Sequence, residues 1–351
     1  MVHIIAEIAN AHQGCPKAAF ELAKKSAESG ADSIKFQIYT ADELLTTDHP
    51  RYEHFKDQAF LKEEWDNLLT KSKRLGVKVY ADIFGLEAYE IASSNQVDGY
   101  KIHSSDLNNT KLLEVLADQE RCVFLATGGS TLLEIRYAID KLTKFNKVSE
   151  IILLHGFQSY PTKVEDSRIS RLPKLQELFG DNIMIGYSDH IDADDKFATL
   201  LPLMTIPYGV SYIEKHVTMD RSAKGVDYYS SYEPKELEKF IEDVRLAEQS
   251  IGSNSLGFSD AEKKYRNSVK KSWTATRDIK SNTIIKPNDV AMKRPLNFFA
   301  PPMYEEIVGA KILKDVNKED SITRSMVDSK VLAIIVARND SSRLHGKATK
   351  D

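Results

Sequence analysis

Two lysines lie where the surrounding sequence predicts buried strands. Lys35 and Lys101 each sit inside, or just after, a short run of apolar and aromatic residues. Because lysine is almost never buried without an anionic partner, two such lysines from different strands suggest a bound phosphate or carboxylate. The alternative is structural, since each lysine could pair with a carboxylate of the chain itself, such as Glu7 or Asp106.

Two histidines follow the last two strand-like segments of the same part of the chain. His190 and His216 are the residues concerned, and Asp189 and Glu214 stand close to them in the sequence. Imidazole and carboxylate groups are ligands of divalent metals, so two imidazoles on adjacent strands could hold such an ion. Either histidine taken alone is better explained as a solvated loop residue or as a histidine whose hydrogen bonds are satisfied by neighbouring side chains.

Short hydroxyl side chains near other strand ends would suit the oxygens of a phosphate. Ser104, Thr127 and Ser188 stand at predicted turns. Hydroxyl groups can add hydrogen bonds to the charge that lysines bring to an anion. These groups can act together only if the strands that carry them end on one side of the fold.

A TIM (β/α)8 barrel would bring the strand ends together. From residue 3 to about residue 251 the chain alternates strand-like runs with amphipathic stretches, one of which begins at Leu61 and stops at Gly76. Eight such units in about 250 residues are typical of this α/β fold, whose active sites lie at the C-terminal ends of the strands. A doubly wound sheet is disfavoured because the first turn, Asn10 to Gly14, is not a dinucleotide fingerprint. The predicted strands are His3–Ile8, Ser33–Ile38, Val77–Asp82, Gly99–Ile102, Cys122–Ala126, Glu150–Leu154, Asn182–Ile185 and Val210–Glu214.

The pattern changes after the predicted barrel domain, residues 1–258. Residues 259–272 are polar and charged, which predicts a linker. Residues 273–328 contain short alternating segments separated by turns, as expected for a small β-rich module that docks on something larger. Residues 329–351 open with a new apolar strand, which predicts the start of a further domain that is cut short.

Composition excludes several classes of partner. The charges of the 48 basic and 52 acidic residues nearly cancel. The sequence has no basic stripe with interleaved aromatic residues, so we do not expect nucleic acid as a partner. The most apolar stretch, residues 198–210, contains two prolines and is too short to span a membrane. The first predicted strand begins at His3, so no signal peptide is expected. The spacing of Cys15 and Cys122 matches neither a metal-binding nor a redox motif. We expect a cytoplasmic protein.

The order and near-family spacing of the motifs over residues 3–327 resemble the sialic acid synthase family. The resemblance implies a metal-dependent enzyme, using Mn2+ or Mg2+, that joins phosphoenolpyruvate to a sugar aldehyde. The sugar would be N-acetylmannosamine or a related aldose, and the products a nonulosonic acid and inorganic phosphate. It also identifies the small module as an antifreeze-like (SAF) domain. The matching motifs include Ala6-Glu7-Ile8-Ala9-Asn10-Ala11-His12-Gln13-Gly14, Lys35-Phe36-Gln37, Tyr100-Lys101-Ile102, Tyr160-Pro161-Thr162, Ser188-Asp189-His190, Glu214-Lys215-His216 and Lys293-Arg294-Pro295.

Site roles follow from this resemblance position by position. The implied metal ligands are His190 and His216. The implied phosphoenolpyruvate contacts are Lys35, Lys101, Ser104 and Ser188, and the positions that line or orient the sugar are Glu7, Gln37, Tyr160 and Asp227. We add Thr127 and Gln158 as substrate-binding residues and Glu7 and Asp106 as candidate acid or base groups. Arg294 would enter the active site of a partner subunit, which implies a domain-swapped homodimer.

The chain departs from the family at several positions around the substrate. Asp82 stands where the family usually has threonine near the phosphate, and a carboxylate there would repel phosphate unless it is paired. The segment His103-Ser104-Ser105-Asp106 replaces a usual Gly-Ser-Gly-Glu. We expect Asp82 to form an ion pair with Lys35 or Lys101, or to turn toward a sugar hydroxyl.

The last residues resemble a different family. Val331 to Lys347 is similar to the opening of sugar cytidylyltransferases, in which a strand leads into a basic loop that wraps nucleotide phosphates. This predicts the synthase part of a longer fusion that would activate its product with CMP. The alternative is a basic, flexible tail.

Two other functions compete with the synthase. A pyruvate aldolase on a TIM barrel would need a Schiff-base lysine or a carboxylate-rich metal site, and it would release no phosphate. A degenerate homologue that only binds sugar, or serves as a scaffold, is suggested by Asp82 and the other departures. Release of phosphate from phosphoenolpyruvate distinguishes the synthase from both.

Overall fold

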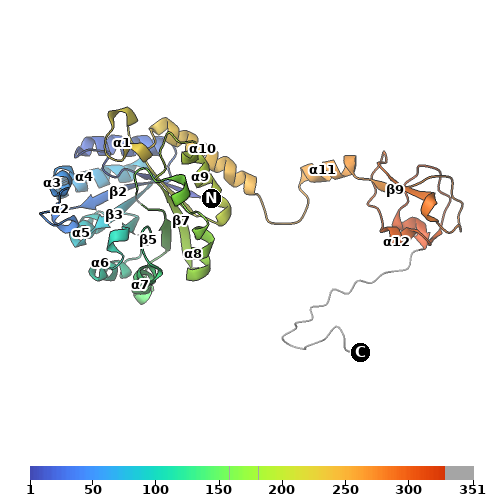
Figure 1. The fold of residues 1–351 in the computed structure, drawn as a ribbon, viewed down its shortest axis with the longest axis horizontal. Coiled ribbons are helices and arrows are strands. Elements are labelled where there is room, and N and C mark those ends of the chain that lie inside the picture. Colours follow the sequence, from blue (N-terminus) through green and yellow to red (C-terminus); the bar gives the residue numbers. More distant parts are fainter. Residues whose placement is uncertain (158, 181, 329–351) are drawn as a thin grey trace, which may run out of the picture. The chain divides into compact units, whose positions relative to one another are not determined.

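The first part of the chain is a closed barrel of eight parallel strands in sequential order, which confirms the predicted TIM barrel. The structure is a computed structural model that describes residues 1–157, 159–180 and 182–328. The chain divides into two compact units, Met1–Ser253 and a second that begins at Asn254 (Figure 1). The barrel strands are β1 His3–Glu7, β2 Ser33–Tyr39, β3 Lys78–Phe84, β4 Gly99–Ile102, β5 Cys122–Ala126, β6 Ile151–His155, β7 Ile183–Asp189 and β8 Tyr212–His216.

Helices surround the strands (Figure 1). The amphipathic stretch that begins at Leu61 forms α4 and a short 3-10 turn, and Gly76 ends that turn with a left-handed φ of 81°. Glycine accepts this backbone conformation without steric cost, which explains why the helical pattern stops there. The helices of this unit are α1 Pro16–Glu28, α2 Ala41–Leu44, α3 Tyr52–Gln58, α4 Lys62–Ser72, α5 Leu86–Ser94, α6 Thr110–Ala117, α7 Leu132–Leu142, α8 Arg171–Phe179, α9 Phe197–Thr205 and α10 Pro234–Ile251.

The interior of the barrel is apolar in its lower layer. Tyr80, Phe124 and Tyr212 come from β3, β5 and β8, and their rings contact one another at centroid distances of 4.9 and 5.1 Å. These strands are not neighbours in the barrel, so the contacts run through its centre. The same cluster, which closes the barrel beneath the polar residues, also contains Ile5, Cys122, Ile152 and Leu154.

Strands β7 and β8 extend further toward the C-terminal end than the sequence predicted. The predicted seventh strand ended at Ile185, whereas β7 continues to Asp189, and β8 continues to His216. Serine and aspartate usually mark strand ends, but here Ser188 is paired in register with Glu214 and Asp189 with Lys215. Cross-strand pairing between polar residues therefore overrides their weak strand propensity.

The second unit has a small core of its own. Its described residues, which end at 328, form two antiparallel two-stranded sheets, and Ile279, Ile285, Ile307 and Ile312 are fully buried within its core. The segment predicted as a linker contains a helix, α11, which Ser259 and Glu262 cap at its start. The elements of this unit are α11 Asp260–Val269, β9 Ser272–Ala275, β10 Val290–Lys293, α12 Tyr304–Ile307, β11 Lys311–Ile312 and β12 Val327–Asp328.

Two further sequence predictions concern the last residues of the chain and membrane-spanning segments. The cytidylyltransferase-like opening, residues 329–351, lies outside the described residues. Among the helices of the described residues, none combines the length and apolar character needed to cross a membrane.

A buried histidine beside the first helix should make the barrel sensitive to acid. His12 Nδ1 accepts a hydrogen bond from the Gly14 N–H at 3.1 Å, and its ring packs on Phe60 at 4.4 Å. Burial lowers the pKa of His12 to about 4. In the unfolded chain His12 has the ordinary pKa near 6.5, so it binds a proton at a pH where the folded protein does not. The free energy of unfolding therefore falls as the pH decreases from about 6.5 to 4.

We predict that His12→Asn reduces this acid sensitivity. Asparagine retains an acceptor for Gly14 but does not titrate, so the variant should lose on the order of 2 kcal/mol less stability than wild type between pH 7 and pH 5. Urea unfolding at both pH values measures the difference. The same pH dependence in the variant and in wild type would contradict the assignment to His12.

Candidate active site

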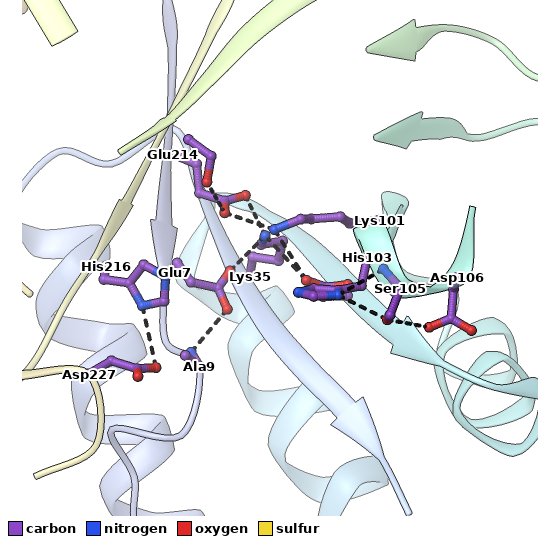
Figure 2. A network of polar contacts seen from close by, with 12 residues as sticks. Glu7, Ala9, Lys35, Lys101, His103, Ser105, Asp106, Glu214, His216 and Asp227 are labelled. Atoms are coloured by element: carbon purple, nitrogen blue, oxygen red, sulfur yellow. Dashed lines mark hydrogen bonds and ion pairs between the residues drawn. The ribbon is translucent and has the colours of Figure 1, made fainter. Parts of the chain in front are cut away.

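Two lysines and three carboxylates form one buried network across the upper barrel (Figure 2). Lys35 pairs with Glu7 at 2.8 Å and with Glu214, while Lys101 lies 2.9 Å from Glu214 and 3.2 Å from Asp82. These side chains come from β1, β2, β3, β4 and β8, and each is at most 2% exposed. The predicted lysines therefore meet at the centre of the barrel.

The network fixes the charge state of Lys101 and Glu214. Burial alone would lower the pKa of Lys101, but Asp82, Glu214 and Glu7 outweigh it and raise that pKa well above the usual range. Burial alone would raise the pKa of Glu214, but Lys101 and Lys35 together hold it well below its usual range. Lys101 is therefore a cation and Glu214 an anion at neutral pH.

Glu7 is the carboxyl of the network that can hold a proton near neutrality. Burial raises its pKa to about 7, against the opposing charge of Lys35. Its Oε1 accepts a hydrogen bond from the Ala9 N–H at 3.1 Å, and Ala9 itself has a left-handed φ of 42°. A non-glycine residue in this conformation costs about 1–2 kcal/mol, so the turn that supplies the N–H is strained.

Asp82 forms the ion pair that the sequence analysis expected. Its Oδ2 lies 3.2 Å from the ammonium of Lys101 and 3.8 Å from that of Lys35. By distance these are ion pairs, yet neither oxygen of Asp82 makes a well-aligned hydrogen bond within the described residues. Asp82 therefore balances charge but leaves acceptor positions that a ligand could use.

The two predicted metal-binding histidines lie side by side. The rings of His190 and His216 are 5.1 Å apart, and Tyr160 contacts both at 5.1 and 5.5 Å. Burial lowers the pKa of His190 to about 3 and that of His216 well below its usual value. Both imidazoles are therefore neutral at pH 7, the form that binds a metal ion.

The donor set fits a divalent ion bound by two protein ligands. Neither ring nitrogen of His190 has a hydrogen-bond partner among the described residues, and the Tyr160 hydroxyl is 3.5 Å from His216 Nε2. Buried nitrogens without partners are costly unless a ligand binds them. In the described part of the chain no group of three or more His, Cys, Asp or Glu residues could hold a metal, so the remaining ligands would come from substrate or water.

Asp189, which the sequence placed near the metal, faces the other side of the barrel wall. Its Oδ2 pairs with the Lys215 ammonium, and its Oδ1 accepts a hydrogen bond from the Tyr187 hydroxyl at 3.1 Å. Lys215 also lies 4.0 Å from the ring centroid of Tyr232. Because side chains alternate along a strand, this buried pair sits directly behind His190 and His216 and joins β7 to β8.

A cavity of about 360 Å³ opens at the barrel mouth. It is lined by Gln37, Tyr160 and Asp227, three of the four residues that the resemblance placed around the sugar. Burial raises the pKa of Asp227 to about 6, and its Oδ2 is 3.9 Å from His216 Nδ1. The cavity therefore adjoins the histidine pair. Its wall also includes an apolar group, Leu44, Phe55, Phe84 and Val226, and a polar group, Asn10, Tyr39, Arg51, His103 and Ser105.

Other predicted residues lie in different surroundings. The Ser188 hydroxyl donates to Glu214 at 2.9 Å and so joins the lysine network, whereas the Thr127 hydroxyl donates to the Leu154 carbonyl at 3.2 Å. Ser104 and Asp106 begin and end a 3-10 turn after β4, and neither lines the cavity. Arg294 is exposed in the second unit, and Gln158 lies outside the described residues.

The sequence analysis missed the central role of Glu214. This carboxylate contacts both lysines and Ser188, so it occupies the donors that were assigned to phosphoenolpyruvate. A signal was present, because an ionisable residue in the strand Tyr212 to His216 needs a buried partner as much as the lysines do.

Comparison with known proteins places the chain in one family. Residues 22–255 match the NeuB family, and residues 270–328 match the SAF domain. The chain is 31% identical over 326 residues to the N,N'-diacetyllegionaminic acid synthase of Legionella pneumophila, which covers 88% of this chain and 90% of that protein. It is 29% identical over 339 residues to the pseudaminic acid synthase of Campylobacter jejuni, with coverage of 92% and 96%.

A solved structure supports the same assignment. The crystal structure of the N-acetylneuraminic acid synthetase from Leptospira borgpetersenii in complex with citrate aligns with a TM-score of 0.69 and 31% identity. The alignment covers 76% of this chain and 92% of that chain.

Breaking the buried pair behind the histidines should cost the protein much of its stability. We predict that Lys215→Met costs about 3–5 kcal/mol at pH 7, because it leaves Asp189 buried without its cation. Burial already raises the pKa of Asp189. The loss relative to wild type should therefore shrink at pH 5, where the unpaired carboxyl takes up a proton. Chemical denaturation at both pH values measures it.

Two further variants control this experiment. Lys147→Met breaks an exposed pair with Asp118 and should cost far less. Lys215→Met combined with Asp189→Asn removes both charges and should recover part of the loss. If Lys215→Met were no more harmful than Lys147→Met, the pair would not have the assigned role.

Proposed function

The chain belongs to the NeuB family and is an enzyme of the sialic acid synthase type, and on this premise we propose that it condenses phosphoenolpyruvate with an aldose. The products would be a nonulosonic acid and inorganic phosphate. The observation that carries the proposal is the juxtaposition of two buried ammonium groups, a pair of neutral imidazoles and a cavity at one end of the barrel.

Lys35 and Lys101 would bind the anionic groups of phosphoenolpyruvate. Both ammonium groups already face carboxylate oxygens, which shows that the centre of the barrel accepts anionic oxygens at hydrogen-bond distance. Glu214 holds both lysines and Ser188 in place. Binding of the substrate would therefore require Glu214 to share or release these donors, since three carboxylates and an anionic substrate repel one another.

The histidine pair would hold the divalent metal of the reaction. Held by His190 and His216 alone, such an ion would have room for water and for the aldehyde oxygen. When bound, such an ion supplies Lewis-acid polarisation of the carbonyl. Asp227 and Tyr160 flank the same imidazoles and also line the cavity, so they would orient the sugar there.

The reaction forms a bond between C3 of phosphoenolpyruvate and the aldehyde carbon, while water adds to C2 and phosphate leaves by C–O cleavage. The aldehyde oxygen gains a proton and the attacking water loses one. Glu7, with a pKa raised to about 7, is the carboxyl best placed to hold one of these protons at neutral pH. Lys35 beside it would stabilise the ionised form after the proton leaves.

A lysine Schiff base, which a pyruvate aldolase of this fold could use, is disfavoured by the charge of Lys101. The amine must lose its proton to attack a carbonyl, but the surrounding carboxylates raise the pKa of Lys101 well above its usual range, against the effect of burial. Borohydride trapping with pyruvate should therefore not label Lys101.

We predict that the protein releases phosphate from phosphoenolpyruvate only when an aldose and Mn2+ or Mg2+ are present. A colourimetric phosphate assay with a panel of acetamido aldoses tests this. His216→Ala and His190→Ala should each reduce turnover by more than about 100-fold, since they remove direct ligands rather than outer groups. Both variants should also weaken Mn2+ binding measured by electron paramagnetic resonance without unfolding the protein.

Several outcomes would contradict parts of this proposal. Full turnover in excess chelator would remove the metal from the mechanism. Binding of aldoses without any phosphate release would favour a protein that only binds sugar. Product formation from pyruvate without phosphate would favour the aldolase.

We also propose a domain-swapped homodimer, on the resemblance alone. Arg294 would then reach the active site of the partner subunit, and Arg294→Ala should raise the aldose KM by about 10- to 100-fold through loss of a charge-assisted hydrogen bond. Lys293→Ala, at the neighbouring exposed position, is the matched control. Light scattering should give about twice the chain mass of 39.6 kDa.

A mixed dimer tests whether Arg294 enters the active site of the partner subunit or that of its own subunit. One subunit carries His216→Ala and the other Arg294→Ala. With swapped domains, the intact barrel receives the intact arginine from its partner, and one site is fully active. Turnover as low as in the Arg294→Ala homodimer would show that the arginine acts within its own subunit.

The product would be a precursor of surface glycans. An acid of this class must be activated before transfer, and CMP activation is the reaction that the segment 329–351 predicts by resemblance. That segment lies outside the described residues, and its role stays a prediction.

A further inference from the structure

One wall of the cavity at the barrel mouth is a small aromatic cluster with a cation at its edge. The rings of Tyr39 and Phe55 are 5.4 Å apart and meet at 84°, and those of Tyr39 and Phe84 are 6.3 Å apart at 90°. The guanidinium carbon of Arg51 lies 4.8 Å from the ring centroid of Phe55. All four residues line the cavity, so a ligand there meets apolar rings and a positive charge side by side.

This wall is held in place by contacts within the chain. The Tyr39 hydroxyl donates to the Asn10 side-chain oxygen at 2.8 Å. The two carboxylate oxygens of Glu43 accept the backbone N–H groups of Leu86 and Glu87, at the start of α5, at 3.0 Å each. The segment that joins β2 to α3 is therefore anchored, and the rings need little rearrangement when a ligand binds.

The guanidinium of Arg51 carries only hydrogen-bond donors, so a ligand that binds it must bring an acceptor. Within residues 1–157, 159–180 and 182–328, no carboxylate lies at ion-pair distance from this group. Asp227 lines the same cavity, and burial raises its pKa while the charge of Arg51 acts in the opposite direction. The cavity thus offers a donor and an acceptor that do not occupy each other.

The balance of charge decides which acceptor suits Arg51. The carboxylates of the site outnumber its cationic side chains, and even with a divalent ion bound, the phosphate and carboxylate of phosphoenolpyruvate restore the negative balance. A second anionic group would be repelled in this poorly screened place, whereas a neutral carbonyl oxygen would not. The cations are Lys35, Lys101 and Arg51, and the carboxylates are Glu7, Asp82, Glu214 and Asp227.

We propose that Arg51 is a specificity-determining residue that donates a hydrogen bond to the carbonyl oxygen of an N-acyl group on the aldose. The acyl methyl group packs against Phe55 and Phe84. An acetamido group carries a neutral oxygen and an apolar methyl on one carbon, which matches a guanidinium that lies on an aromatic ring. The inference rests on the proposed function, because it takes an aldose as the ligand of the cavity.

Two sugars that differ at the acyl group test the assignment. N-acetylmannosamine carries the acetamido group, and mannose has a hydroxyl in its place. Arg51→Met retains a long apolar side chain over Phe55 but removes the donors. It should raise the KM and the Kd of N-acetylmannosamine by about tenfold, the effect of one lost hydrogen bond. The Kd of mannose and the phosphoenolpyruvate KM should stay within about twofold, since neither ligand uses Arg51.

Arg136→Met is the matched control. Arg136 is exposed, and its guanidinium carbon lies 5.5 Å from the ring centroid of Phe179, so the substitution and the ring contact are of the same kind but lie off the cavity. This variant should leave all of these constants unchanged. Melting temperatures check that both variants fold.

A measurement on wild type needs no variant. In saturation-transfer NMR, the acetyl methyl protons of N-acetylmannosamine should receive more saturation than the protons of the sugar ring, because the methyl group packs on the aromatic cluster. Stronger saturation of the sugar ring would contradict the placement of the acyl group.

The outcomes separate this inference from the proposed function. If wild type releases no phosphate, the proposed function fails, while the Kd values measured with Mg2+ alone still test Arg51. Equal Kd values for N-acetylmannosamine and mannose in wild type would overturn the inference, as would an unchanged Kd in Arg51→Met. Tighter binding of N-acetylmannosamine 6-phosphate that is lost in Arg51→Met would show that Arg51 binds a phosphate instead of an acyl group.

Discussion

The buried balance of charge between Lys35, Lys101 and three carboxylates is the constraint on which the site depends. Ionised groups removed from water are stable only when partners and hydrogen bonds replace the lost hydration. A closed barrel provides this, because strands that are not neighbours point side chains at one centre, as β4 and β8 do through Lys101 and Glu214. Beneath the charges an apolar layer that includes Tyr80 and Phe124 closes the barrel.

The same two strands carry a structural pair on one face and functional groups on the other. Along β7 and β8 the outward residues Asp189 and Lys215 form a buried ion pair, and the inward Ser188 and Glu214 join the lysine network. The next inward position, at and just after the strand ends, gives the histidine pair. The outer pair fixes the relative position of the two strands, and the geometry of the imidazoles follows from it.

The site is organised by depth. The deepest layer holds fixed charges suited to an anionic substrate, the next holds neutral imidazoles suited to a metal, and the cavity above combines apolar rings with amide and hydroxyl groups suited to a sugar. The departure at residues 103–106 falls in this outer layer, where His103 and Ser105 line the cavity. Differences in sugar preference can therefore arise there without disturbing the buried charges below.

The sequence by itself determined the barrel, because alternating strand-like runs and amphipathic helices are local patterns that burial of one face imposes. It also determined which residues carry charge into the strands, and the pairing of Asp82 was expected from Lys35 and Lys101 alone. Only the tertiary structure decided which carboxylate each lysine meets, since Glu214 lies more than a hundred residues from Lys101 and contacts it through the barrel centre. It likewise turned Asp189 away from the histidines and directed the Thr127 hydroxyl to a backbone carbonyl. Side chains along a strand alternate between its two faces. The sequence alone leaves open which face a given residue occupies, because a register shift of one residue reverses the assignment until the strands are paired.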